Sequence, residues 1–70
     1  MVLRVPPSRV LKDALAYPEG EHFEHALGRS VRRHGGDYRD YANLILQVRE
    51  TALNRKLSLR DAARWIADQA

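Results

Sequence analysis

Apolar residues recur every three or four positions along most of this chain, a spacing that places them on one side of an α-helix. The pattern predicts four helices, at about residues 8–16, 21–34, 38–55 and 58–69. The segment from Met1 to Val5 is expected to form a short extended arm. No linker divides the chain, and no internal repeat is found. The sequence therefore predicts one all-α domain over residues 1–70, folded as a compact bundle of four helices.

Residues at the predicted helix ends match the chemistry of helix termini. Pro7 suits a first turn, where its missing N–H would have had no partner. Gly35 can adopt the left-handed conformation that often closes a helix. Asp37 and Asp40 have the spacing of a capping box at the start of the third helix. Residues 58–61 have the same spacing, so the fourth helix is expected to begin there.

The third helix is predicted to be the longest and to act as the hub of the bundle. Its apolar stripe consists of Tyr38, Tyr41, Ala42, Leu44, Ile45, Val48 and Ala52. A stripe this wide indicates contact with more than one neighbouring helix. Arg49 and Lys56 project near the middle of the stripe. Each is therefore expected to extend its charge into water, pair with a carboxylate or face a partner chain.

Composition narrows the class of protein. The chain has 70 residues and no cysteine, so it must fold without disulfides, which fits a reducing, cytoplasmic compartment. No apolar run is long enough to span a bilayer, and no membrane partner is expected. Lysine and arginine number 12 against 9 acidic residues, which gives a formal charge of +3. That balance favours an anionic partner such as nucleic acid.

The most suggestive surface lies on the second predicted helix. Its residues His22, His25, Arg29, Arg32 and Arg33 fall within about a third of the helix circumference. Guanidinium groups gathered on one exposed face can neutralise several phosphates. We therefore expect a small regulatory protein that binds nucleic acid through His25, Arg29, Arg32 and Arg33. The alternative is an ordinary solvated face, because Glu21 and Glu24 lie one turn away.

Two short segments resemble known DNA-binding families. The third and fourth predicted helices, with a short connection between them, can form a helix-turn-helix whose last helix presents Arg60, Arg64 and Gln69 to a major groove. Separately, the string Leu57 to Ala63 resembles the first helix of many helix-turn-helix domains. Leu3 to Val5, which precedes two helices, resembles the strand of ribbon-helix-helix proteins. That second resemblance implies a dimer whose strand contacts DNA.

Catalytic and metal-binding chemistry is poorly represented. His22 and His25 have a spacing at which helical histidines can share a metal, but no further ligand completes a site. No serine lies beside a histidine and an acid in a recognisable arrangement, and glycine-rich phosphate motifs are absent. We therefore expect a protein that is not an enzyme and that has no metal or cofactor.

A protein-interaction module is the competing hypothesis. Such a module would dock or dimerise through the third and fourth helices, with Arg49 and Trp65 as the partner-binding residues. Broad apolar faces in so short a chain also make a homodimer credible, because association would bury the surplus apolar surface. The two hypotheses differ in salt dependence: phosphate binding weakens steeply as salt rises, whereas apolar docking changes little.

Overall fold

The computed structural model describes residues 5–17 and 22–69, and these residues form four α-helices. Helix α1 spans Pro7–Leu15, α2 Phe23–Arg33, α3 Tyr38–Arg55 and α4 Leu59–Gln69. The predicted all-α fold and its four helices are confirmed, with helix ends within one or two residues of those expected. The start of the predicted arm, Glu21 at the predicted start of the second helix, and Ala70 lie outside the described residues.

The helix ends are held by the predicted local contacts. Pro7 is the first residue of α1. At the start of α3 the backbone N–H of Asp40 donates to Asp37 Oδ1 (3.3 Å), and the N–H of Asp37 donates to Asp40 Oδ2 (2.9 Å), so the capping box is confirmed. In front of α4, Ser58 Oγ accepts from the N–H of Asp61 (3.1 Å). These contacts involve residues at most three positions apart, so a local pattern could predict them.

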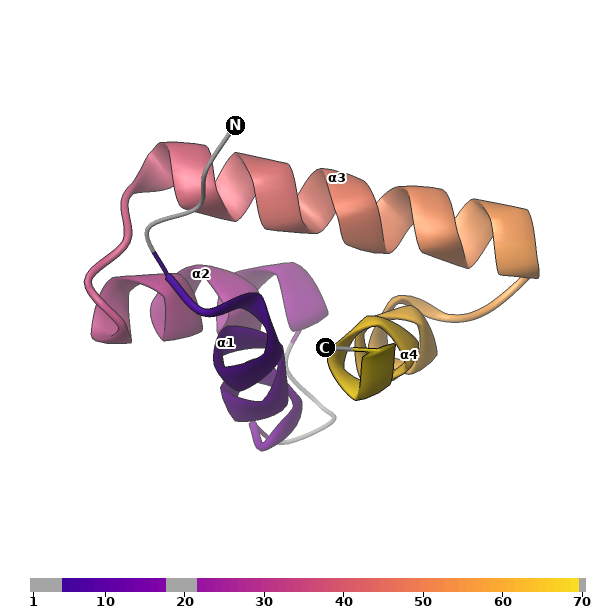
Figure 1. Ribbon diagram of the computed structural model, residues 1–70, viewed down its shortest axis with the longest axis horizontal. Helices are drawn as coiled ribbons and strands as arrows, with labels where there is room; N and C mark the ends of the chain where they lie inside the picture. Colours follow the sequence, from indigo (N-terminus) through magenta and orange to yellow (C-terminus); the bar gives the residue numbers. More distant parts are fainter. Residues whose placement is uncertain (1–4, 18–21, 70) are drawn as a thin grey trace.

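The helices contact one another in a closed ring. Helix α1 packs against α2 and α4, and α3 packs against the same two helices. In Figure 1, α4 is seen nearly end-on while α3 runs across the view, so the two cross steeply. The expectation that α3 touches more than one helix is confirmed. Its expected role as the hub is wrong, because α1 has an equivalent place in the ring.

The core lies inside this ring. Its largest fully buried apolar side chains come from three helices: Val10 and Leu11 of α1, Leu27 and Val31 of α2, and Leu44 and Val48 of α3. Helix α4 contributes alanines, with Ala62, Ala63 and Ala67 all buried. Small side chains let this helix approach its neighbours closely. Val5 is 2% exposed, so the described end of the predicted arm is packed into the core.

One predicted core residue is on the surface. Tyr38 was expected in the apolar stripe of α3, but it is 78% exposed. In Figure 1, α1, α2 and α4 all lie on the same side of α3. Leu44, Ile45 and Val48 are buried in the middle of α3, whereas Tyr38 is the first residue of the helix. None of the described helices combines the length and apolar character needed to cross a membrane.

Candidate nucleic-acid interface

Helix α2 presents one buried face and one basic face. Phe23, Ala26, Leu27, Ser30 and Val31 are buried. The opposite side carries His22, His25, Arg29, Arg32 and Arg33, all exposed, and we call these five residues the α2 basic face. The structure therefore brings the four predicted nucleic-acid-binding residues together on one accessible surface. Burial of the apolar face causes this arrangement, because a helix that buries one side must turn the other to water.

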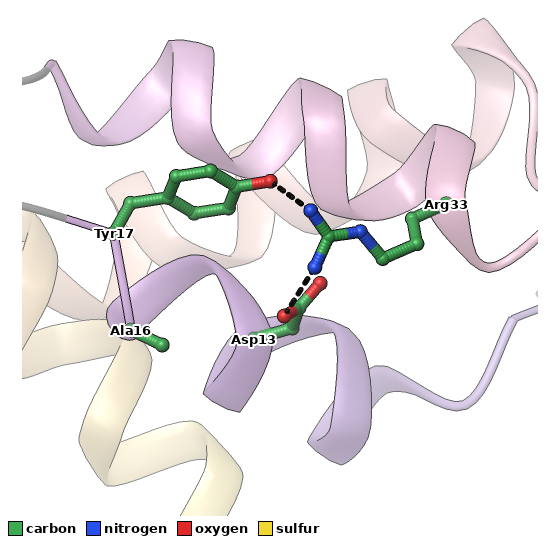
Figure 2. A pocket seen from close by; sticks show the side chains of 4 residues that line it. All are labelled: Asp13, Ala16, Tyr17 and Arg33. Atoms are coloured by element: carbon green, nitrogen blue, oxygen red, sulfur yellow. Dashed lines mark hydrogen bonds and ion pairs between the residues drawn. The ribbon is translucent and has the colours of Figure 1, made fainter.

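Arg33 is tied to α1. Its Nη1 donates to Asp13 Oδ1 (3.1 Å) and its Nη2 donates to the Tyr17 hydroxyl (2.8 Å), as Figure 2 shows. These three residues and Ala16 line an open surface pocket of about 170 Å³. The Arg33 side chain is still 60% exposed. Arg33 can therefore meet a ligand, although part of its charge is already balanced by Asp13.

Asp13 is the acid within this basic surface. Its Oδ2 is buried and accepts no hydrogen bond among the described residues. His34 Nε2 lies 3.7 Å from that oxygen, which is beyond hydrogen-bond distance. No pattern in the sequence places Asp13 at this surface, since it lies on another helix 20 residues before Arg33. Only the packing of α1 against α2 brings them together.

Tyr17 is a second residue of this surface that was not predicted from the sequence. Its ring is half-buried, and the guanidinium carbons of Arg29 and Arg33 lie 5.9 and 5.6 Å from its centre. Both distances fall within the range of a cation–π contact. Tyr17 therefore holds two of the predicted arginines side by side. No sequence signal links Tyr17 to α2, because it follows the end of α1.

His25 and Arg32 complete the basic face. The His25 ring packs edge-on against that of His22, with 5.7 Å between centres. Arg32 borders a hollow of about 140 Å³ formed with the start of α3. Within residues 5–17 and 22–69, neither His25 nor Arg32 forms an ion pair. Their side chains are thus the more available part of the face.

Glu24 points away from the basic face and pairs with α3. The Nε of Arg49 donates to Glu24 Oε2 (3.1 Å), and Arg49 Nη2 donates to the same oxygen. This pairing raises the pKa of Arg49, chiefly through the hydrogen bond to Glu24 and the attraction of its charge. Partial burial and the nearby Glu24 also raise the pKa of Tyr41, so its hydroxyl stays neutral at physiological pH. Glu24, which was expected to weaken the positive charge of the basic face, therefore pairs with Arg49 of α3 instead.

The two predicted partner-binding residues are engaged within the chain and do not share a contact. Arg49 pairs with α2, although 55% of its side chain is exposed. Trp65 is half-buried on α4, and the guanidinium carbon of Arg55 lies 3.8 Å from the centre of its ring. Arg55 follows Arg49 by six residues, which places them on different sides of α3. Trp65 is accordingly covered on one face by its own chain.

The two arginines of α4 also have partners within the chain. Arg60 is half-buried, with its guanidinium carbon 6.0 Å from the centre of the Phe23 ring. Arg64 Nη1 donates to Asp61 Oδ1 (2.9 Å) on the same helix. Across the described ranges, no group of three or more histidine, aspartate or glutamate side chains could hold a metal ion. The basic surface of α2 is therefore the strongest candidate site.

Comparison with known proteins assigns no family to the chain and no role to this surface. The site is described by its own side chains: a basic helix face whose nearest described acids, Asp13 and Glu24, are each paired with an arginine. No family model, no curated protein and no solved structure matches this chain.

Proposed function

We propose that this protein is a small non-enzymatic regulator that binds the phosphate backbone of nucleic acid through the α2 basic face. The observation that supports this is the exposure of His25, Arg29, Arg32 and Arg33 on one side of α2 while Glu24 turns to Arg49. Positive charge is thus concentrated on one surface. A formal charge of +3 draws a polyanion toward the molecule.

The chemistry of the face implies backbone binding. Arginine side chains on a helix surface can each donate several hydrogen bonds to phosphate oxygens, which position a protein without reading sequence. Three arginine contacts would release about three counterions, so the logarithm of the binding constant should fall against that of salt with a slope of about −3 on duplex DNA. A dissociation constant of about 10⁻⁴ to 10⁻⁶ M is expected for such contacts.

The test is a titration of labelled duplex DNA, single-stranded DNA and RNA at about 50 mM and about 150 mM salt. The test variant is Arg29→Gln/Arg32→Gln, which keeps Arg33 because that residue joins α2 to α1. The expected results are binding to at least one nucleic acid at low salt and much weaker binding by this variant. The triple variant Arg29→Ala/Arg32→Ala/Arg33→Ala should abolish what remains.

The control removes the same charge from another surface. Lys56→Gln/Arg64→Gln changes two exposed cations at the end of α3 and on α4. This variant should bind nearly as well as the parent protein, with an unchanged helical circular dichroism spectrum in both variants. Absence of binding at low salt would refute the proposal. Equal losses of affinity in the two variants would also refute it, because they would show that nucleic acid is attracted by net charge alone and has no defined binding surface.

The competing hypothesis, docking through Arg49 and Trp65, has less support. Arg49 already pairs with Glu24, and Arg55 covers one face of Trp65. An interface hot spot usually offers an aromatic or arginine side chain that a partner can surround. These two residues are instead held by their own chain. If docking nevertheless dominates, any complex should form equally well at low and high salt.

A further inference from the structure

One side of α3 carries exposed apolar residues along its whole length. Tyr38, Leu46 and Leu53 are 78%, 56% and 80% exposed, and they are the exposed large hydrophobic residues in the described part of the chain. With Ala42 and Arg49 they are spaced by four, four, three and four residues, which aligns them on one side of a helix. We call these five residues the α3 outer seam. It extends for about 22 Å at 1.5 Å per residue.

The seam contains a hollow of a size that suits a side chain from another helix. Its volume is about 340 Å³, and it is lined by Tyr38, Tyr41, Ala42, Ile45, Leu46 and Arg49. All of these belong to α3, and the small Ala42 lies among larger neighbours. In paired helices, each side chain of one helix enters a hole formed by four residues of the other. The seam thus offers both a hole and, in Leu46 and Leu53, side chains that could fill one.

Charge beside the seam favours a second copy as the occupant. Arg39 and Glu50 are exposed, and neither side chain forms an ion pair with any described residue. They are 11 residues apart, about three turns, so both flank the seam on the same side. In an antiparallel pair of identical helices, the residues on one side of the seam face the residues on the same side of the partner's seam. The two sets run in opposite directions along the chain. Arg39 of each copy can then face Glu50 of the other.

The same register also fits the apolar residues. When Arg39 of one copy lies level with Glu50 of the other, Leu46 of the first copy lies level with Asn43 of the second. Asn43 falls between the residues that line the hollow. Leu53 then lies within about two residues of Tyr38. A parallel pairing would instead bring opposite flanks together, so Arg39 of one copy would lie at the other edge of the interface from the flank that carries Glu50 of the other, and the two could not pair. Arg49 does not oppose antiparallel pairing, since Glu24 already balances its charge.

We propose that two copies of this chain associate through the α3 outer seam, with their α3 helices antiparallel and Arg39 of each copy paired with Glu50 of the other. The interface is isologous, because the same surface is used on both molecules. The seam shares no residue with the α2 basic face, although Tyr38 lines one hollow together with Arg32. Leu46 and Leu53 do not line that hollow, so variants at these two residues test the dimer independently of nucleic-acid binding.

The first test measures molecular mass by sedimentation equilibrium from about 1 µM to about 1 mM protein. The parent protein should show a monomer–dimer equilibrium within this range. The variant Leu46→Glu/Leu53→Glu should raise the dimer dissociation constant at least about tenfold, because it places charge in the apolar seam. The matched control, Gln47→Glu/Asn54→Glu, adds the same charge to exposed positions of α3 away from the seam and should dimerise like the parent.

The second test examines the register through charge reversal. Arg39→Glu alone and Glu50→Arg alone should each weaken the dimer, because like charges would face each other. The double variant Arg39→Glu/Glu50→Arg should restore it, and an equal mixture of the two single variants should form a mixed dimer. A parent protein that stays monomeric at about 1 mM would overturn the proposal. So would equal behaviour of the seam and control variants, or a double variant no better than the single ones.

Discussion

Ser30 Oγ donates a hydrogen bond of 2.7 Å to the carbonyl oxygen of Val10, and both residues are fully buried. This contact joins the middle of α2 to α1. A buried hydroxyl without such an acceptor would destabilise the fold, because it would have lost its hydrogen bonds to water. Ser30 is therefore a structural residue of the core, although it is a polar residue on an otherwise apolar helix face.

Replacing Ser30 tests this contact. Ser30→Ala should lower the free energy of unfolding by about 1 kcal/mol, since it removes one buried hydrogen bond. Ser30→Val should cost about 1–3 kcal/mol, because it removes the hydrogen bond and adds a methyl group at a fully buried position. Urea denaturation measures both values. Ser8→Ala is the control, as Ser8 Oγ donates to the Ala67 carbonyl (3.2 Å) at a half-buried site, and a larger effect there would contradict the assignment.

Replacing Lys56 with glycine should stabilise the fold. Its backbone lies in the left-handed region (φ 58°, ψ 49°), where α3 ends and the chain turns toward α4. A side chain costs about 1 kcal/mol in that conformation, and glycine adopts it freely. Lys56→Gly should therefore raise the free energy of unfolding by about that amount. Lys56→Ala removes the charge but keeps the strain, so a similar gain from alanine would show that charge was the cause.

Two glycines should respond to alanine with opposite signs. A Cβ at Gly36 would lie 2.8 Å from Cγ1 of both Val5 and Val31, so Gly36→Ala should destabilise by about 1–3 kcal/mol. A Cβ at Gly28, inside α2, would meet only the Tyr41 ring at 3.9 Å. Gly28→Ala should therefore stabilise by about 0.5–1 kcal/mol through helix propensity. Thermal unfolding of the two variants measures both, and shifts of the same sign would refute the packing described around Gly36.

Asp13 should restrain nucleic-acid binding. Asp13→Asn removes the carboxylate that balances Arg33, so affinity for nucleic acid should rise about two- to fivefold at low salt. Asp61→Asn provides the same change of charge beside Arg64 on α4. If binding occurs at the α2 basic face, the gain from Asp13→Asn should be the larger. Equal gains in a fluorescence titration would place the nucleic acid elsewhere.

Much of the helical structure was predictable because its signals are local. Pro7, the capping box of Asp37 with Asp40, and the Ser58 cap each act within three residues, so their effect does not depend on the rest of the fold. The buried faces of α1 and α2 were also predictable from the apolar spacing. Tyr38 was the exception, because which part of a wide stripe is buried depends on where the neighbouring helices lie.

The sequence by itself determined where the helices begin and end, and it determined that four arginine and histidine side chains share one face of α2. Tertiary structure alone decided which charged side chains form ion pairs between helices. Arg33 meets Asp13 and Arg49 meets Glu24 across gaps of 20 and 25 residues. The physical reason is that ion pairs depend on distances of a few ångströms between helices, and no periodicity along one helix specifies its distance from another.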